Sequence, residues 1–234
     1  MNTSNRPIKR TVVDCYKSDI ADGRWFVTNQ GIGVDYNGVL VDGQHRLVAL
    51  RELGYPPVKL LVITGLDPNA REVVDQHAKR STRDIWRMFM DLDVATAAPG
   101  VCTVIHGHRA SWGGGKVSPQ KLKDILDEHF AEMQFVLETV RDFRKRWSSP
   151  YLAALVLACK ENPTRWPDIA AFVHRVESGE NLTRKMPEFH LRNLILTASR
   201  TGGGALRSER FAKARRAIAA SLANEELGVL RAAA

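Results

Sequence analysis

A polar tetrapeptide, Gly43-Gln44-His45-Arg46, interrupts an otherwise apolar stretch where strand-like spacing changes to helical spacing. Residues 39–41 read as a strand, and from Leu47 onward apolar residues recur three and four apart. The first turn of a helix exposes unpaired N–H groups and a partial positive charge. A glycine allows close backbone approach, and His45 and Arg46 add donors. The pattern therefore predicts a phosphate-binding turn.

Asp42, directly before this turn, has roles that the sequence leaves open. Its carboxylate could bind Mg²⁺ beside a phosphate, or act as the acid–base group of a phosphate transfer. It could also only cap the helix, with Gln44, His45 and Arg46 in solvent. Because three polar side chains cluster at one strand-to-helix junction, the phosphate-binding interpretation is favoured.

A second polar cluster contains Asp75, His77, Lys79, Arg80 and Arg83. If it is functional, Asp75 is a candidate catalytic base or metal ligand and Arg80 a second phosphate clamp. Ordinary ion pairs at a solvated helix end would produce the same pattern. The residues alone do not choose between these interpretations.

Positive charge is concentrated in the second part of the chain. The net charge is +8, with a balance of +1 over residues 1–100 and +7 over residues 101–234. A basic surface attracts polyanions such as DNA. One predicted helix, residues 205–223, carries the candidate nucleic-acid contacts Arg207, Arg210, Lys213, Arg215 and Arg216. A solvated helix face is the alternative, with Phe211, Ala214 and Ile218 facing a core.

Several protein classes are excluded by composition. No stretch approaches the length of a transmembrane helix, and the N-terminus lacks the apolar segment of a signal peptide. The three cysteines are far apart and form no CxxC pair, so neither a zinc ribbon nor a disulfide framework is indicated. We expect a cytoplasmic protein without a membrane partner.

The first part of the chain alternates helix and strand signals. Helices are predicted at residues 10–22, 44–53, 67–78 and 82–91, and strands at 24–28, 31–35 and 39–41. Asn37-Gly38 is typical of a hairpin turn, and the aliphatic run at 56–65 predicts a buried strand. Amphipathic helices are predicted at 118–130, 131–147, 150–160, 165–177, 187–200 and 205–223. The expected fold is α+β, with a small mixed-sheet domain at residues 1–92 followed by an all-helical domain at 93–234.

The residues around the polar turn resemble the N-terminal domain of ParB/sulfiredoxin-like proteins. More narrowly, they resemble the DGQHR-type members of phages and mobile elements. The matching segments are "NRP" at 5–7, "ADGRW" at 21–25, "DYNGVLVDGQHRL" at 35–47 and "VDQHAKRSTRDI" at 74–85, with softer matches at "ESGENL" (177–182) and "MPEFHLRNLI" (186–195). The 35–47 segment is the most specific of them.

The resemblance implies a nucleotide site at Gly43, Gln44, His45 and Arg46. ParB proteins hold the triphosphate of CTP with a Gly-x-x-Arg segment, and sulfiredoxins hold ATP phosphates with Gly-x-His-Arg. The expected ligands are therefore an NTP (ATP or CTP) and Mg²⁺. Sulfiredoxins carry a catalytic Cys where this chain has Gln44, which argues against sulfinic-acid reduction. "DQHAKR" at 75–80 only loosely matches the second ParB motif, which argues against CTP hydrolysis.

The expected function is that of a nucleotide-binding ParB/sulfiredoxin-like protein that acts on or with DNA, through an NTP-dependent switch or phosphotransfer. As an enzyme it would be an NTPase or a kinase-like phosphotransferase. The alternatives are a ParB-like nuclease, which the lack of a dense carboxylate cluster disfavours, and a non-enzymatic DNA-binding module. The expected partners are a nucleotide and DNA. A homodimer is left open.

Overall fold

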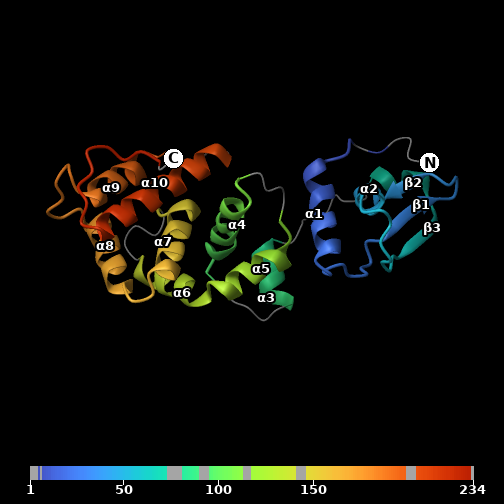
Figure 1. Cartoon of the computed structure of the whole chain (residues 1–234). Helices are drawn as coiled ribbons and strands as arrows, with labels where there is room; N and C mark the ends of the chain where they lie inside the picture. Colours follow the sequence, from blue (N-terminus) through green and yellow to red (C-terminus); the bar gives the residue numbers. More distant parts are fainter. Residues whose placement is uncertain are drawn as a thin grey trace. The chain divides into compact units, whose positions relative to one another are not determined.

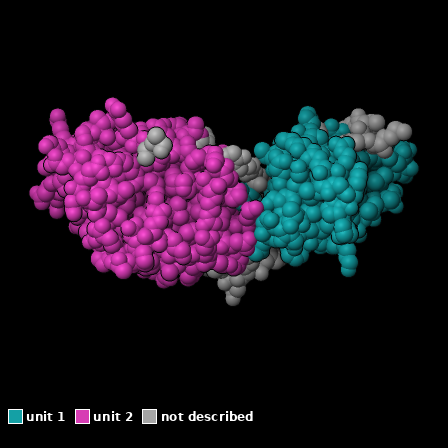
Figure 2. Space-filling model, viewed as in Figure 1, with its two compact units in different colours: residues 1–81, 115–120 teal, residues 82–114, 121–234 magenta. Residues whose placement is uncertain are grey.

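The structure is a computed structural model that describes residues 5, 7–72, 81–89, 95–112, 117–140, 146–198 and 204–232. Its internal contacts divide the chain into two compact units (Figure 2). Unit 1 comprises residues 1–81 and 115–120, and unit 2 comprises residues 82–114 and 121–234. Among the described residues the chain forms ten α-helices and a single three-stranded mixed sheet, which confirms the predicted α+β class.

Unit 1 holds the sheet and the two helices that accompany it (Figure 1). Its elements are α1 (Arg10–Ala21), β1 (Ile32–Asp35), β2 (Leu40–Asp42), α2 (Gln44–Glu52), β3 (Val62–Leu66) and the 3₁₀-helix η1 (Pro68–Glu72). The strand order is β2-β1-β3, with β1 antiparallel to β2 and parallel to β3. Helix α2 is the crossover that carries the chain from β2 to β3, and α1 packs against it.

The turn between β1 and β2 has the predicted hairpin chemistry. Asp35 is 3% exposed, and its Oδ1 accepts hydrogen bonds from the backbone N–H of Asn37 at 2.9 Å and of Val39 at 2.8 Å. Gly38 has a φ of 75°, a conformation that side chains with a Cβ rarely adopt. The Asn37-Gly38 signal therefore places the reversal correctly.

Two strand predictions differ from the structure. Residues 24–28 form no strand. The strand predicted over 56–65 does form as β3, but it is exposed rather than buried: it lies at the edge of the sheet, and Val62 is 56% exposed. An aliphatic run identifies a strand, but its burial depends on what other elements cover it.

The regular secondary structure described in unit 2 is all helical. Its helices are α3 (Thr82–Phe89), α4 (Ala98–Arg109), α5 (Pro119–Glu128, of which the unit includes residues from Lys121), α6 (Phe130–Thr139), α7 (Ser149–Glu161), α8 (Trp166–Ser178), α9 (Pro187–Thr197) and α10 (Gly204–Leu222). Helix α7 packs against α4, α6 and α10, and most of its residues are buried. Within the described ranges, the structure contains no helix long and apolar enough to cross a membrane.

The pattern analysis missed α4. No helix was predicted over residues 98–109, and Pro99 and Gly100 lie in the first turn of α4. Proline is tolerated there because the first N–H groups of a helix have no intrahelical partner.

Candidate phosphate-binding site

Gly43 forms the sharp turn between β2 and α2. Its φ is 98°, in the left-handed region. A Cβ at this position would lie 2.5 Å from Ile32 Cδ1 on the neighbouring strand β1. Packing against β1 therefore accounts for the glycine without any ligand, although the sequence suggested that it allows a phosphate to approach.

Asp42 contacts the groups that the sequence assigns to a phosphate. Its Oδ1 accepts a 2.6 Å hydrogen bond from the Gly43 N–H, and its Oδ2 lies 3.6 Å from Arg46 Nη2. One backbone amide and one guanidinium thus converge on a single carboxylate. In the structure, the Asp42 carboxylate occupies the position at this turn that the sequence assigns to a phosphate oxygen.

Arg46 points into unit 1. The residue is 9% exposed, donates a hydrogen bond to the carbonyl oxygen of Gly31, and holds its guanidinium carbon 5.9 Å from the centre of the Tyr16 ring. Charge-assisted hydrogen bonds to a buried carbonyl fix a guanidinium firmly. Arg46 is therefore part of the internal framework as well as a candidate ligand contact.

Gln44 and His45 are each 7% exposed, which rules out the alternative in which the tetrapeptide is solvated. His45 Nε2 lies 3.0 Å from the backbone N of Lys9, which donates to it. Because that nitrogen accepts, the imidazole is neutral and carries its proton on Nδ1. His45 thus fastens the segment before α1 to the start of α2. Asp75 and Arg80 lie outside the described residues.

An ion-pair cluster holds α1 against α2. Glu52 on α2 accepts hydrogen bonds from Arg10 Nη2 at 2.7 Å and from Lys17 Nζ at 3.1 Å, and both donors lie on α1. The hydrogen bonds from Arg10 and Lys17 lower the pKa of Glu52 to about 2. The cluster sets the position of α2, and therefore of Arg46, relative to α1.

A cavity of about 220 Å³ opens beside the guanidinium of Arg46. Among its described lining residues are Arg24, Arg46, Lys59 and the acid Asp19. Arg24 is paired with Asp19 and with Asp22, so its charge is already balanced. Trp25 borders it too, and its Nε1 donates to the carbonyl of Lys59 at 2.9 Å. Arg46 is the only member of the tetrapeptide that lines the cavity. Sequence reasoning placed the ligand at the helix amides, whereas the open space lies at the far end of the arginine side chain.

The charge on α10 is partly neutralised. Arg215 donates twice to Glu161, at 2.6 and 2.7 Å, Arg216 pairs with Glu225, and Lys213 pairs with Glu209 at 2.6 Å. Phe211, Ala214 and Ile218 are buried, as predicted. Arg207 is exposed. The helix therefore presents less unbalanced positive charge than its sequence suggests.

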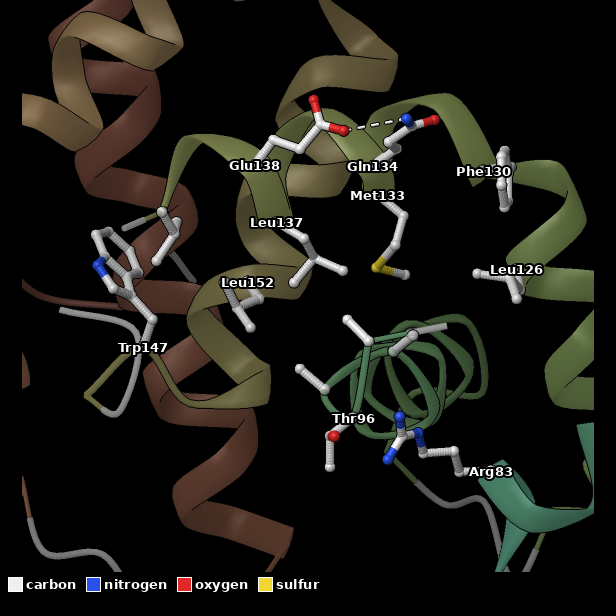
Figure 3. A pocket seen from close by; sticks show the side chains of 14 residues that line it. Arg83, Thr96, Leu126, Phe130, Met133, Gln134, Leu137, Glu138, Trp147 and Leu152 are labelled. Atoms are coloured by element: carbon white, nitrogen blue, oxygen red, sulfur yellow. Dashed lines mark hydrogen bonds between the residues drawn. The ribbon is translucent and has the colours of Figure 1, made fainter. Parts of the chain in front are cut away.

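A larger cavity, of about 850 Å³, lies within unit 2 and was not anticipated from the sequence (Figure 3). Apolar side chains from α5, α6 and α7 form much of its wall, among them Leu126, Met133, Leu137 and Leu152. Trp147 also borders it. That residue is 3% exposed and donates from Nε1 to Glu177 Oε1 at 3.0 Å, so it is a core side chain.

The described residues contain no group of three His, Cys, Asp or Glu side chains that could hold a metal ion. Asp42 would thus be a single protein ligand, which suits Mg²⁺, because this ion commonly takes one or two carboxylates together with phosphate oxygens and water.

No protein-family model matches the chain, and no curated protein or solved structure shows significant similarity to it. The ParB/sulfiredoxin resemblance stays a prediction.

Proposed function

We propose that unit 1 binds the phosphate groups of a nucleoside triphosphate, ATP or CTP, together with Mg²⁺, as the resemblance implies. The observation that carries this proposal is the convergence of the Gly43 N–H and the Arg46 guanidinium on the carboxylate of Asp42. Donors that hold a carboxylate in this way also suit a phosphate oxygen. The cavity beside Arg46, which Lys59 also lines, adds space for a ligand.

Asp42 makes the proposed binding depend on magnesium. A phosphate and a carboxylate at the same turn repel each other, and Mg²⁺ supplies the charge that lets both remain there. Arg46 then orients the phosphate while its bond to the Gly31 carbonyl holds the guanidinium in place. The Gly43 N–H becomes available when Asp42 turns towards the metal.

Titration calorimetry with ATP, CTP and GTP, each with and without Mg²⁺, tests the proposal. The Asp42→Asn variant should bind nucleotide without Mg²⁺ about tenfold or more tightly than the wild type, because like charges about 4 Å apart repel by roughly 1–4 kcal/mol. Asp14→Asn, which changes an exposed acid on α1, is the matched control and should leave binding unchanged. If neither the wild type nor Asp42→Asn binds any nucleotide in the presence of Mg²⁺, the proposal is wrong.

DNA contact by unit 2 is a second candidate function, supported by the +7 charge balance of residues 101–234. A salt titration of duplex binding tests it, since each phosphate contact steepens the salt dependence. Arg207→Ala should weaken binding and lower the salt slope by about one. Lys213→Ala should have a smaller effect, because Glu209 already pairs with that lysine. Incubation of a supercoiled plasmid with Mg²⁺ tests for nuclease activity.

A further inference from the structure

The cavity within unit 2 has the size and the lining of a small-molecule site. Its volume of about 850 Å³ lies within the range of ligand pockets, about 300–1,000 Å³. Much of its wall consists of side chains that are almost fully buried: Leu126 and Val140 are each 1% exposed, and Met133 is 3% exposed. Phe130, by contrast, is 48% exposed and marks a side that opens to solvent.

A cavity of this size is filled by solvent or by a ligand. A dry void as large would cost more free energy than the whole stability of an ordinary domain. Water that covers apolar side chains is released favourably when an apolar group replaces it. The thioether of Met133 also adapts to groups of different shape. The lining therefore favours a ligand with an apolar body.

The charged side chains at the cavity differ in how they lie. Among the described residues that line it, Arg83 and Glu138 are the charged ones. Glu138 accepts a 3.0 Å hydrogen bond from Gln134 Nε2, and this pair lies at the edge of the cavity, whereas Leu137 of the same helix points into it (Figure 3). Arg83 approaches from α3, across the cavity from α6. A guanidinium thus lies across an apolar space from aliphatic side chains.

We propose that this cavity binds a small amphipathic carboxylate, with its apolar body against Leu126 and Met133 and its carboxylate on Arg83. A guanidinium holds a carboxylate through two parallel hydrogen bonds. One arginine balances one negative charge, whereas a phosphate monoester carries about 1.5 to 2 and would leave charge unbalanced in an apolar site. The site is separate from the phosphate-binding turn proposed for unit 1.

Calorimetry of the full chain with three amphiphiles of equal chain length tests the preference for a carboxylate. The probes are decanoate, decanol and decyltrimethylammonium, each below the concentration at which it forms micelles. Decanoate should bind once per chain and about tenfold or more tightly than decanol, because charge-assisted hydrogen bonds are the stronger ones. Decyltrimethylammonium should bind no better than decanol. Equal affinity for decanoate and decanol, or no binding of decanoate, overturns the proposal.

Substitution of the arginine locates the carboxylate. Arg83→Gln should weaken decanoate binding about tenfold or more and leave decanol binding unchanged. Arg87→Gln is the matched control, because Arg87 is an exposed cation on the same helix and is not among the residues that line the cavity. An equal loss in both variants would show that decanoate responds only to the overall charge of unit 2. That result, or unchanged binding in Arg83→Gln, contradicts the proposed site.

Filling the cavity locates the apolar body. Leu137→Trp places a larger side chain in the space and should weaken the binding of decanoate and decanol alike, by about tenfold or more. Leu196→Trp, at an exposed position on α9, is the control and should change neither. Circular dichroism and thermal unfolding check that both variants are folded. Wild-type affinity in a folded Leu137→Trp variant would place the ligand elsewhere and refute the proposal. Should this variant not fold, the comparison of Arg83→Gln with Arg87→Gln decides.

Discussion

Asp42 Oδ2 and Arg46 Nη2 lie 3.6 Å apart, one helical turn from each other at the start of α2. The two side chains are held unequally. Arg46 is 11% exposed at its side chain and bonded to the Gly31 carbonyl, whereas Asp42 is 30% exposed there. Arg46 is therefore the fixed member of the pair, and Asp42 is the one that a ligand can displace at lower cost.

Gly43→Ala should destabilise the protein by about 2–4 kcal/mol, because it adds both backbone strain and overpacking against Ile32. Gly38→Ala is the matched control. Gly38 also has a positive φ, but its Cβ would meet nothing within 4 Å, so only the conformational penalty of about 1–2 kcal/mol applies. Urea unfolding measures both. Equal losses in the two variants would show that contact with Ile32 is unimportant.

Arg46→Ala should lower the free energy of unfolding by about 1–3 kcal/mol, since the Gly31 carbonyl loses its hydrogen bond inside the unit. The sequence predicted Arg46 as a phosphate contact, and a side chain with that role alone would matter little for stability. Arg51→Ala, on the exposed face of the same helix, should change stability by less than about 0.5 kcal/mol. Chemical denaturation followed by circular dichroism compares the two. A stable Arg46→Ala variant would contradict the internal role.

Glu52→Gln should remove a pH-dependent contribution to stability. The pKa of Glu52 in the folded protein is about 2, below its ordinary value of 4.5, because Arg10 and Lys17 donate to it. A lowered pKa means that the carboxylate stabilises the fold above about pH 4.5 and loses this effect as the pH falls towards 2. The difference in melting temperature between wild type and variant should shrink over that range. High salt should also reduce it, because the pair is exposed.

Cys102 and Cys159 should resist alkylation in the native protein. Both side chains are fully buried, and burial raises the pKa of each thiol to about 12, so almost no thiolate forms. Cys15 is only partly buried. Iodoacetamide at mildly alkaline pH should therefore add one group to the native chain and three in denaturant, as read by intact mass. Rapid modification of all three cysteines without denaturant would contradict the described core.

Local sequence signals predicted much of the fold. The Asn37-Gly38 hairpin, the start of α2 after Gly43 and the buried face of α10 all follow from residue type and spacing over a few positions. These features depend on contacts between near neighbours in the chain. Helix α4 was not predicted, although its Pro99 lies in the first turn, where proline is tolerated.

Only the tertiary structure decided what Arg46 and β3 contact. Besides Asp42, the partners of Arg46 are Gly31 and Tyr16, which lie 15 and 30 positions away in the chain, and no spacing rule relates these two to Arg46. The exposure of β3 likewise depends on which elements lie beside it and not on its own aliphatic residues. Periodicity reports which side chains avoid water, but the arrangement of distant segments determines whether another part of the same chain covers them.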